Sequence, residues 1–163
     1  MPAVTVPVAM RWSDMDAYGH VNNTEFFRYT EQARIEALAL VKARPDTGTL
    51  VVRHEVEYLV PLEYRSDGVQ VDVWITRIGG AGFDLGYEVA TLGPASGDDE
   101  AADGRGGDTE DAGERRRTVH ARSASTMVMY SFSAAAPRRI SPEEREFLEG
   151  MTGPEVRFRR SGR

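Results

Sequence analysis

The chain has 163 residues, 40% of them hydrophobic and 28% charged, which is typical of one soluble globular domain spanning residues 1–163. A net charge of −6 argues against a nucleic-acid-binding protein, and the absence of cysteine excludes disulfides, thiolate metal sites and a cysteine nucleophile. The sequence shows neither a signal peptide nor the run of about 18 apolar residues that a membrane span requires, so we expect a cytoplasmic protein without membrane contact.

The first third of the chain predicts a strand, a loop and a helix in that order. The strand spans 4–12, where Pro7 indicates an edge strand or a strand start. The loop, residues 13–23, is rich in Asp, Gly and Asn. A helix is expected over 24–43, ending before Pro45. Its apolar residues recur at spacings of three and four: Phe26, Tyr29, Ala33, Ala37, Leu40 and Val41.

The rest of the chain predicts an antiparallel sheet. Alternating apolar and polar residues indicate four strands joined by hairpins, at 52–60, from 69 to at least 75, from 83 to at least 89, and at about 118–132. A short helix is expected after Ser141, with Pro142 as its first residue. Because the long helix is the best candidate to cover the apolar face of the sheet, we expect an α+β fold.

An acidic, glycine-rich segment, residues 93–117, interrupts the pattern between the last two predicted strands. It contains no large apolar residue, so it cannot bury enough surface to offset the entropy of ordering it. We interpret it as a disordered insertion in a hairpin connection, with a charged docking segment as the alternative. Loop-closure entropy grows slowly with length, so the fold can tolerate such an insertion.

The loop before the long helix is the segment that indicates chemistry. It contains two carboxylates, Asp14 and Asp16, either of which can act as a nucleophile or take a proton from water. The first turn of the helix adds backbone N–H groups without intrahelical partners, which can stabilise an oxyanion. Aspartate before a helix is also a common cap or turn residue, and the residues alone do not choose between the two.

The run from Arg11 to Asn23, RWSDMDAYGHVNN, continues with Phe26, Tyr29, Glu31, Ala33 and Arg34. This segment resembles the signature of the 4-hydroxybenzoyl-CoA thioesterase-like hotdog family, and the resemblance extends over nearly the whole chain apart from 93–117. It implies a hotdog fold, a curved antiparallel sheet wrapped around one long central helix. It further implies an acyl-CoA thioesterase, assembled as a homodimer or homotetramer with active sites at subunit interfaces.

The resemblance also implies roles for single residues. Asp16 corresponds to the catalytic carboxylate, as nucleophile or general base, and the N–H of Asn23 to the group that polarises the thioester carbonyl. Asp14 is expected to organise the loop. The remaining substrate-binding positions implied by the motif are Tyr18, Gly19, His20 and Asn22. No metal or redox cofactor is implied, because CoA is part of the substrate.

The other candidates carry weaker indications. The alternation of strand residues places His54 in the core or at an interface and His120 at the surface, and three histidines so scattered do not form a zinc site. The aromatic residues at 26, 27 and 29 are expected in the core, with the lining of an acyl tunnel as the alternative. Charge alone suggests Arg138 and Arg139 as contacts for the CoA phosphates.

Two rival functions remain for this fold. A hotdog hydratase pairs a carboxylate with a histidine in a differently spaced motif, which the stretch 19–23 does not match. A non-catalytic hotdog module that binds acyl-CoA is the second rival, and the intact Asp16 argues against it. The acyl group itself, and the choice between CoA and acyl-carrier protein, depend on a pocket that the sequence does not describe.

Overall fold

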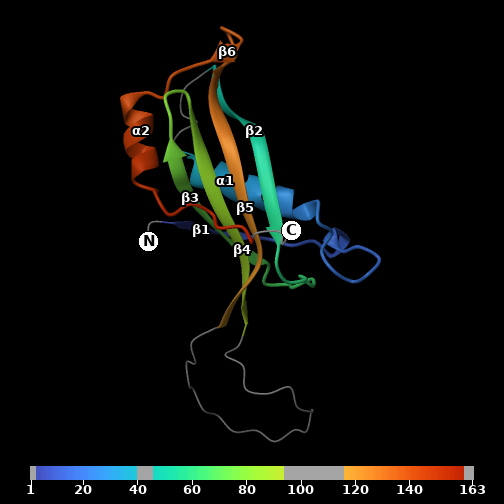
Figure 1. Cartoon of the computed structure of the whole chain (residues 1–163). Helices are drawn as coiled ribbons and strands as arrows, with labels where there is room; N and C mark the ends of the chain where they lie inside the picture. The colour runs from blue at the N-terminus through green and yellow to red at the C-terminus, as the bar shows by residue number, and fades with distance from the viewer. Residues whose placement is uncertain (1–2, 40–45, 94–115, 160–163) are drawn as a thin grey trace, which may run out of the picture.

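The computed structural model describes residues 3–39, 46–93 and 116–159 (Figure 1). Its strands form one antiparallel sheet in the order β1-β3-β4-β5-β2, with β6 paired to β5. This confirms the predicted helix-on-antiparallel-sheet architecture. The elements are β1 (Val4–Val8), η1 (Trp12–Asp14), α1 (Glu25–Ala37), β2 (Thr47–Tyr58), β3 (Val69–Ile78), β4 (Gly82–Gly93), β5 (Arg116–Ser131), β6 (Ala136–Pro137) and α2 (Pro142–Glu149).

Helix α1 lies across one face of the sheet, as Figure 1 shows behind the strands. Up to Ala37, the apolar stripe predicted from the sequence is the face it buries, together with Thr30. Opposite it, alternate residues of the central strands are fully buried, among them Val71, Val73, Phe83, Leu85 and Tyr87. The main core therefore forms between α1 and the inner strands.

The expected helix over 24–43 is wrong at its C-terminal end. Helix α1 has 13 residues and ends at Ala37, so the single long central helix is not confirmed. Leu38 leaves the helical conformation, its N–H bonds to the carbonyls of Arg34 and Glu36, and its side chain is buried in the core. Positions 40–43 of the prediction lie outside the described residues.

The two edges of the sheet differ in composition. Strand β1 forms one edge, as Pro7 predicts, and pairs with β3. Strand β2 forms the other edge and carries exposed apolar side chains at Leu50, Val51 and Val52. A register shift between Val51 and Arg53 leaves Val52 exposed while His54 remains half-buried, so the predicted common face holds only beyond this bulge.

Strands β4 and β5 extend into both ends of the predicted insertion. Gly93 pairs with Arg116, and Arg117 forms ion pairs with Asp72 of β3 and Glu88 of β4. The ends of the 93–117 segment are therefore strand, which is a correction at these residues. The remainder, 94–115, lies outside the described residues.

Helix α2 packs beside β3, and its Leu148 belongs to the main core. Ser141 caps α2 through the capping box with Glu144, and Pro142 is the first helical residue, as predicted. The following stretch crosses in front of the strands in Figure 1, where Trp74 Nε1 donates to the carbonyl of Pro154. Within the described ranges, neither helix is long and apolar enough to cross a membrane.

Candidate functional site

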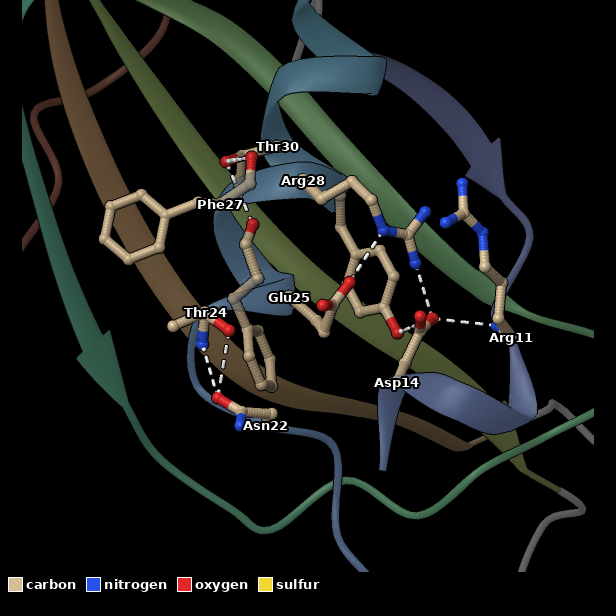
Figure 2. A network of polar contacts seen from close by, with 10 residues as sticks. Arg11, Asp14, Asn22, Thr24, Glu25, Phe27, Arg28 and Thr30 are labelled. Atoms are coloured by element: carbon tan, nitrogen blue, oxygen red, sulfur yellow. Dashed lines mark hydrogen bonds and ion pairs between the residues drawn. The ribbon is translucent and has the colours of Figure 1, made fainter. Parts of the chain in front are cut away.

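Asp14 ties the loop to the helix. Its carboxylate is buried, and one oxygen accepts hydrogen bonds from Arg11 N at 2.8 Å, Arg28 Nη2 at 2.5 Å and Tyr29 Oη at 2.8 Å. Figure 2 shows this carboxylate between Arg11 and Arg28. Burial and the hydrogen bond to Asp14 raise the pKa of the Tyr29 hydroxyl, which therefore remains a donor. This agrees with the expected loop-organising role of Asp14.

Asp16 begins a tight turn two residues later. Its backbone N–H donates to the carbonyl of His20 at 2.7 Å, and one carboxylate oxygen accepts the N–H of Tyr18 at 2.8 Å. Gly19 takes the left-handed conformation that the turn requires, with φ of 79°. Among the residues that the structure describes, none donates to the second carboxylate oxygen of Asp16. One oxygen thus holds the turn, and the other remains available.

The loop opens onto a hollow of about 500 Å³. Four of the six predicted site residues line it: Asp16, Tyr18, His20 and Asn23. Gly19 and Asn22 do not line it; Gly19 shapes the turn, and Asn22 Oδ1 accepts the N–H of Thr24, the N-cap residue of α1. The rest of the wall comes from Val21, Phe26, Tyr58, Leu59, Val60, Pro61 and Leu62.

At the start of α1, the backbone N–H groups of Asn23 and Phe26 have no acceptor among the described residues, and both residues line the hollow. Asn22 N donates to the carbonyl of Asp14 at 2.8 Å. Thr24 N donates to Asn22 Oδ1 at 3.0 Å, as Figure 2 shows. Glu25 N donates to the carbonyl of Asn22 at 2.9 Å. Within the described part of the chain, the N–H of Asn23 has no acceptor. The amide that the resemblance assigns to the oxyanion is thus free, at a helix N-terminus where such donors are concentrated.

The wall at 58–62 was not predicted as part of the site. It is held against the loop by the hydrogen bond from Val21 N to the carbonyl of Leu62 at 2.7 Å. Phe26 packs edge-on against Tyr58, with ring centroids 5.3 Å apart, so the N-terminal aromatic of α1 contributes to both core and hollow. The sequence offered one signal, the family-like run from Tyr58 to Leu62, but no local pattern joins it to the loop.

His120 is buried, so its predicted place at the surface is wrong. A β-bulge in β5, between the pairs Val89–Ala121 and Ala90–Val119, breaks the alternation and turns His120 inward. Its ring bonds to Thr91 Oγ1 at 2.9 Å and lies 3.0 Å from the carbonyl of Pro61. His120 therefore anchors the wall of the hollow from behind.

Of the other weaker candidates, Phe27 is exposed, so its expected place in the core is wrong, whereas His54 and Arg138 have structural partners. His54 Nδ1 lies 2.6 Å from Ser125 Oγ, and burial, followed by the charge of Arg34, lowers its pKa. Arg138 binds both oxygens of Glu144, which makes it unsuited to the suggested contact with CoA phosphates. Among the described residues, no three His, Cys, Asp or Glu side chains are grouped so that they could hold a metal ion.

The profile of the thioesterase-like superfamily matches residues 10–148, which include the loop, α1 and strands β2–β5. The chain belongs to this superfamily. The match confirms the resemblance of the Arg11–Arg34 segment to the thioesterase-like hotdog proteins. None of the curated proteins matches the chain significantly.

Solved thioesterase-superfamily structures share the fold. A predicted thioesterase from Bacillus stearothermophilus is 23% identical, covers 94% of this chain and 99% of its own, and has a TM-score of 0.71. A thioesterase from Thermus thermophilus, complexed with coenzyme A and Zn, is 24% identical over 94% of this chain and 97% of its own, with a TM-score of 0.65. A superfamily protein from Jannaschia sp. is 15% identical over 93% and 85%, with a TM-score of 0.68.

Proposed function

We propose that this superfamily member is an acyl-CoA thioesterase that hydrolyses an acyl-CoA to the free acid and CoA. The observation that carries the proposal is the hollow before α1, lined by a carboxylate with one unoccupied oxygen, Asp16, and by a free helix-start amide, Asn23 N–H. CoA as the carrier is supported by the Thermus thermophilus relative, which was solved with coenzyme A.

In the proposed reaction, Asp16 takes a proton from water as the water oxygen attacks the thioester carbonyl carbon. The alternative is that Asp16 attacks the carbonyl itself and water then hydrolyses the resulting anhydride. In either route, negative charge develops on the carbonyl oxygen, where the N–H of Asn23 stabilises it. The C–S bond then breaks, and the CoA thiolate leaves and takes up a proton. No metal or redox cofactor takes part in this proposal.

We further propose that the protein works as a homodimer or homotetramer with a site at each subunit interface. The β2 edge supports this, because it carries exposed apolar side chains and, among the described strands, pairs only with β5, so another strand can add to its outer side. The hollow supports it as well, since Tyr18 and Tyr58 on its rim remain well exposed in the single chain.

The central test replaces Asp16 with Asn, which retains an oxygen for the turn but cannot take a proton or attack. Thiol release should be measured on acetyl-, octanoyl-, palmitoyl-, isovaleryl- and benzoyl-CoA. We expect the parent to turn over at least one of these and Asp16→Asn to lose about 10²–10⁴-fold in kcat. Asp67→Asn, the same change in an exposed turn, is the matched control and should retain parent activity.

The outcomes separate the rival functions. Equal activity of Asp16→Asn and the parent would show that the carboxylate is not the catalytic group. Tight acyl-CoA binding without thiol release by the parent would instead favour the non-catalytic binding module.

A further inference from the structure

Tyr58, the last residue of β2, reaches the start of α1 through its hydroxyl. Tyr58 Oη donates to the backbone carbonyl of Asn23 at 2.9 Å, across a sequence separation of 35 residues. Its ring packs edge-on against Phe26, and both side chains line the hollow that also contains Asp16. The proposed chemistry gives Tyr58 no step, yet it bonds to the residue whose amide would receive the oxyanion.

The hydrogen bond from Tyr58 restricts the backbone conformation of Asn23, the residue whose N–H would bind the oxyanion. Peptide units are planar, so only φ and ψ of Asn23 separate its N–H from its C=O. The unit before it is held through the carbonyl of Asn22, which accepts the N–H of Glu25 at 2.9 Å. The unit after it is held at both ends, because Thr24 N donates to Asn22 Oδ1 and Tyr58 binds the carbonyl oxygen. With both flanking units held, the direction of the Asn23 N–H is limited.

We propose that Tyr58 is a positioning residue of the oxyanion site, which aims the Asn23 N–H at the substrate carbonyl by fixing the Asn23 carbonyl. The inference rests on the proposed thioesterase function and adds a residue that the loop motif does not contain. Burial raises the pKa of the Tyr58 hydroxyl, so it stays protonated and remains a donor throughout the neutral range.

The position of Tyr58 connects the two walls of the hollow. One wall is the loop with Asp16, and the other is the 58–62 stretch that His120 anchors from behind. A displacement of the second wall would pull on the Asn23 carbonyl through the Tyr58 hydroxyl. An oxyanion donor accelerates the reaction only if it is oriented toward the developing negative charge. A less well oriented donor should therefore lower kcat more than it weakens substrate binding.

The test is Tyr58→Phe, which removes only the hydroxyl and retains the ring that packs on Phe26. Tyr64→Phe is the matched control, because Tyr64 is 39% exposed against 41% for Tyr58 and does not line the hollow. Both should be assayed by thiol release on the five acyl-CoAs named above. Removal of an oxyanion donor lowers kcat by about 10²–10³-fold. Loss of the orientation of the Asn23 N–H, with the donor still present, should therefore lower kcat by about 10-fold and leave KM within about twofold.

A second measurement reports on the orientation of the Asn23 N–H. In ¹⁵N-labelled protein, the Asn23 amide resonance should shift and exchange faster with solvent in Tyr58→Phe, and remain unchanged in Tyr64→Phe. A kcat of Tyr58→Phe within about twofold of the parent, or a rise in KM alone, would overturn the positioning role. If the parent releases no thiol from any of the five acyl-CoAs, the proposed function fails and this inference fails with it. An active parent with an unaffected Tyr58→Phe rejects the inference alone.

Discussion

Removal of the Asp14 carboxylate should destabilise the whole protein, because three donors converge on one of its oxygens. Asp14→Ala leaves the buried Tyr29 hydroxyl and the Arg28 guanidinium without this acceptor. Loss of one partner of a buried ion pair costs about 3–5 kcal/mol. Arg28 keeps its ion pair with Glu25 and is 25% exposed, so we expect the lower end, about 3 kcal/mol.

For a domain of this size, about 3 kcal/mol corresponds to a decrease in Tm of roughly 10 °C, measurable by calorimetry and by urea unfolding. Asp67→Ala is the control: its ion pair with Arg65 is solvent-exposed, so it should cost less than about 1 kcal/mol. Asp14→Asn, which restores an acceptor without the charge, should fall between Asp14→Ala and the parent. An Asp14→Ala protein that melts within about 2 °C of the parent would refute the account of Asp14 as the tie between η1 and α1.

Two further changes test the periphery. The hydrogen bond from Arg138 lowers the pKa of Glu144 from its ordinary 4.5 to about 2. Glu144→Gln should therefore lower the free energy of unfolding at pH 7 by about 3 kcal/mol. Because the pKa of Glu144 is lower in the folded state, this stabilisation is complete above about pH 4.5 and is lost as the pH falls toward 2. In urea unfolding, the free energies of unfolding of parent and variant should therefore converge near about pH 2. A difference that stays constant with pH, or an equal loss of stability in the exposed Glu146→Gln, would contradict this explanation. Val52→Lys places a charge on the β2 edge, where we propose that a second subunit binds. It should lower both the molar mass measured by light scattering and the thioesterase activity. A parent protein that is monomeric and fully active would rule out this subunit interface.

The sequence predicted the elements whose pattern is local. The apolar stripe of α1 up to Ala37 and the alternation of β3 and β4 show directly which face is buried, and both were confirmed. The C-terminal end of α1 was not predictable in this way, because Leu38 is apolar, continues a helical pattern and carries no glycine or proline signal. The bulges at Val52 and His120 likewise leave no local mark, since an inserted residue changes orientation without changing composition.

The site divided in the same manner. The loop residues are contiguous, so a motif could place Asp16, His20 and Asn23 together before the structure was known. The opposite wall is joined by contacts across tens of residues, from Leu62 to Val21 and from Tyr58 to Asn23. Such contacts depend on how the end of β2 packs against the start of α1, and no periodicity in the sequence predicts that packing.

The two aspartates of the loop show how environment separates residues of the same type. Asp14 is 3% exposed, and the three donors on one of its oxygens hold it in place, so it can neither approach a substrate nor readily give up its partners. Asp16 is half-buried at the hollow, and only one of its oxygens is occupied, by the backbone of its own turn. A carboxylate that takes a proton or attacks a carbonyl needs a lone pair directed at the substrate, and only the second arrangement leaves one. The geometry therefore favours Asp16 for the proposed chemistry, on grounds independent of the motif that first singled it out.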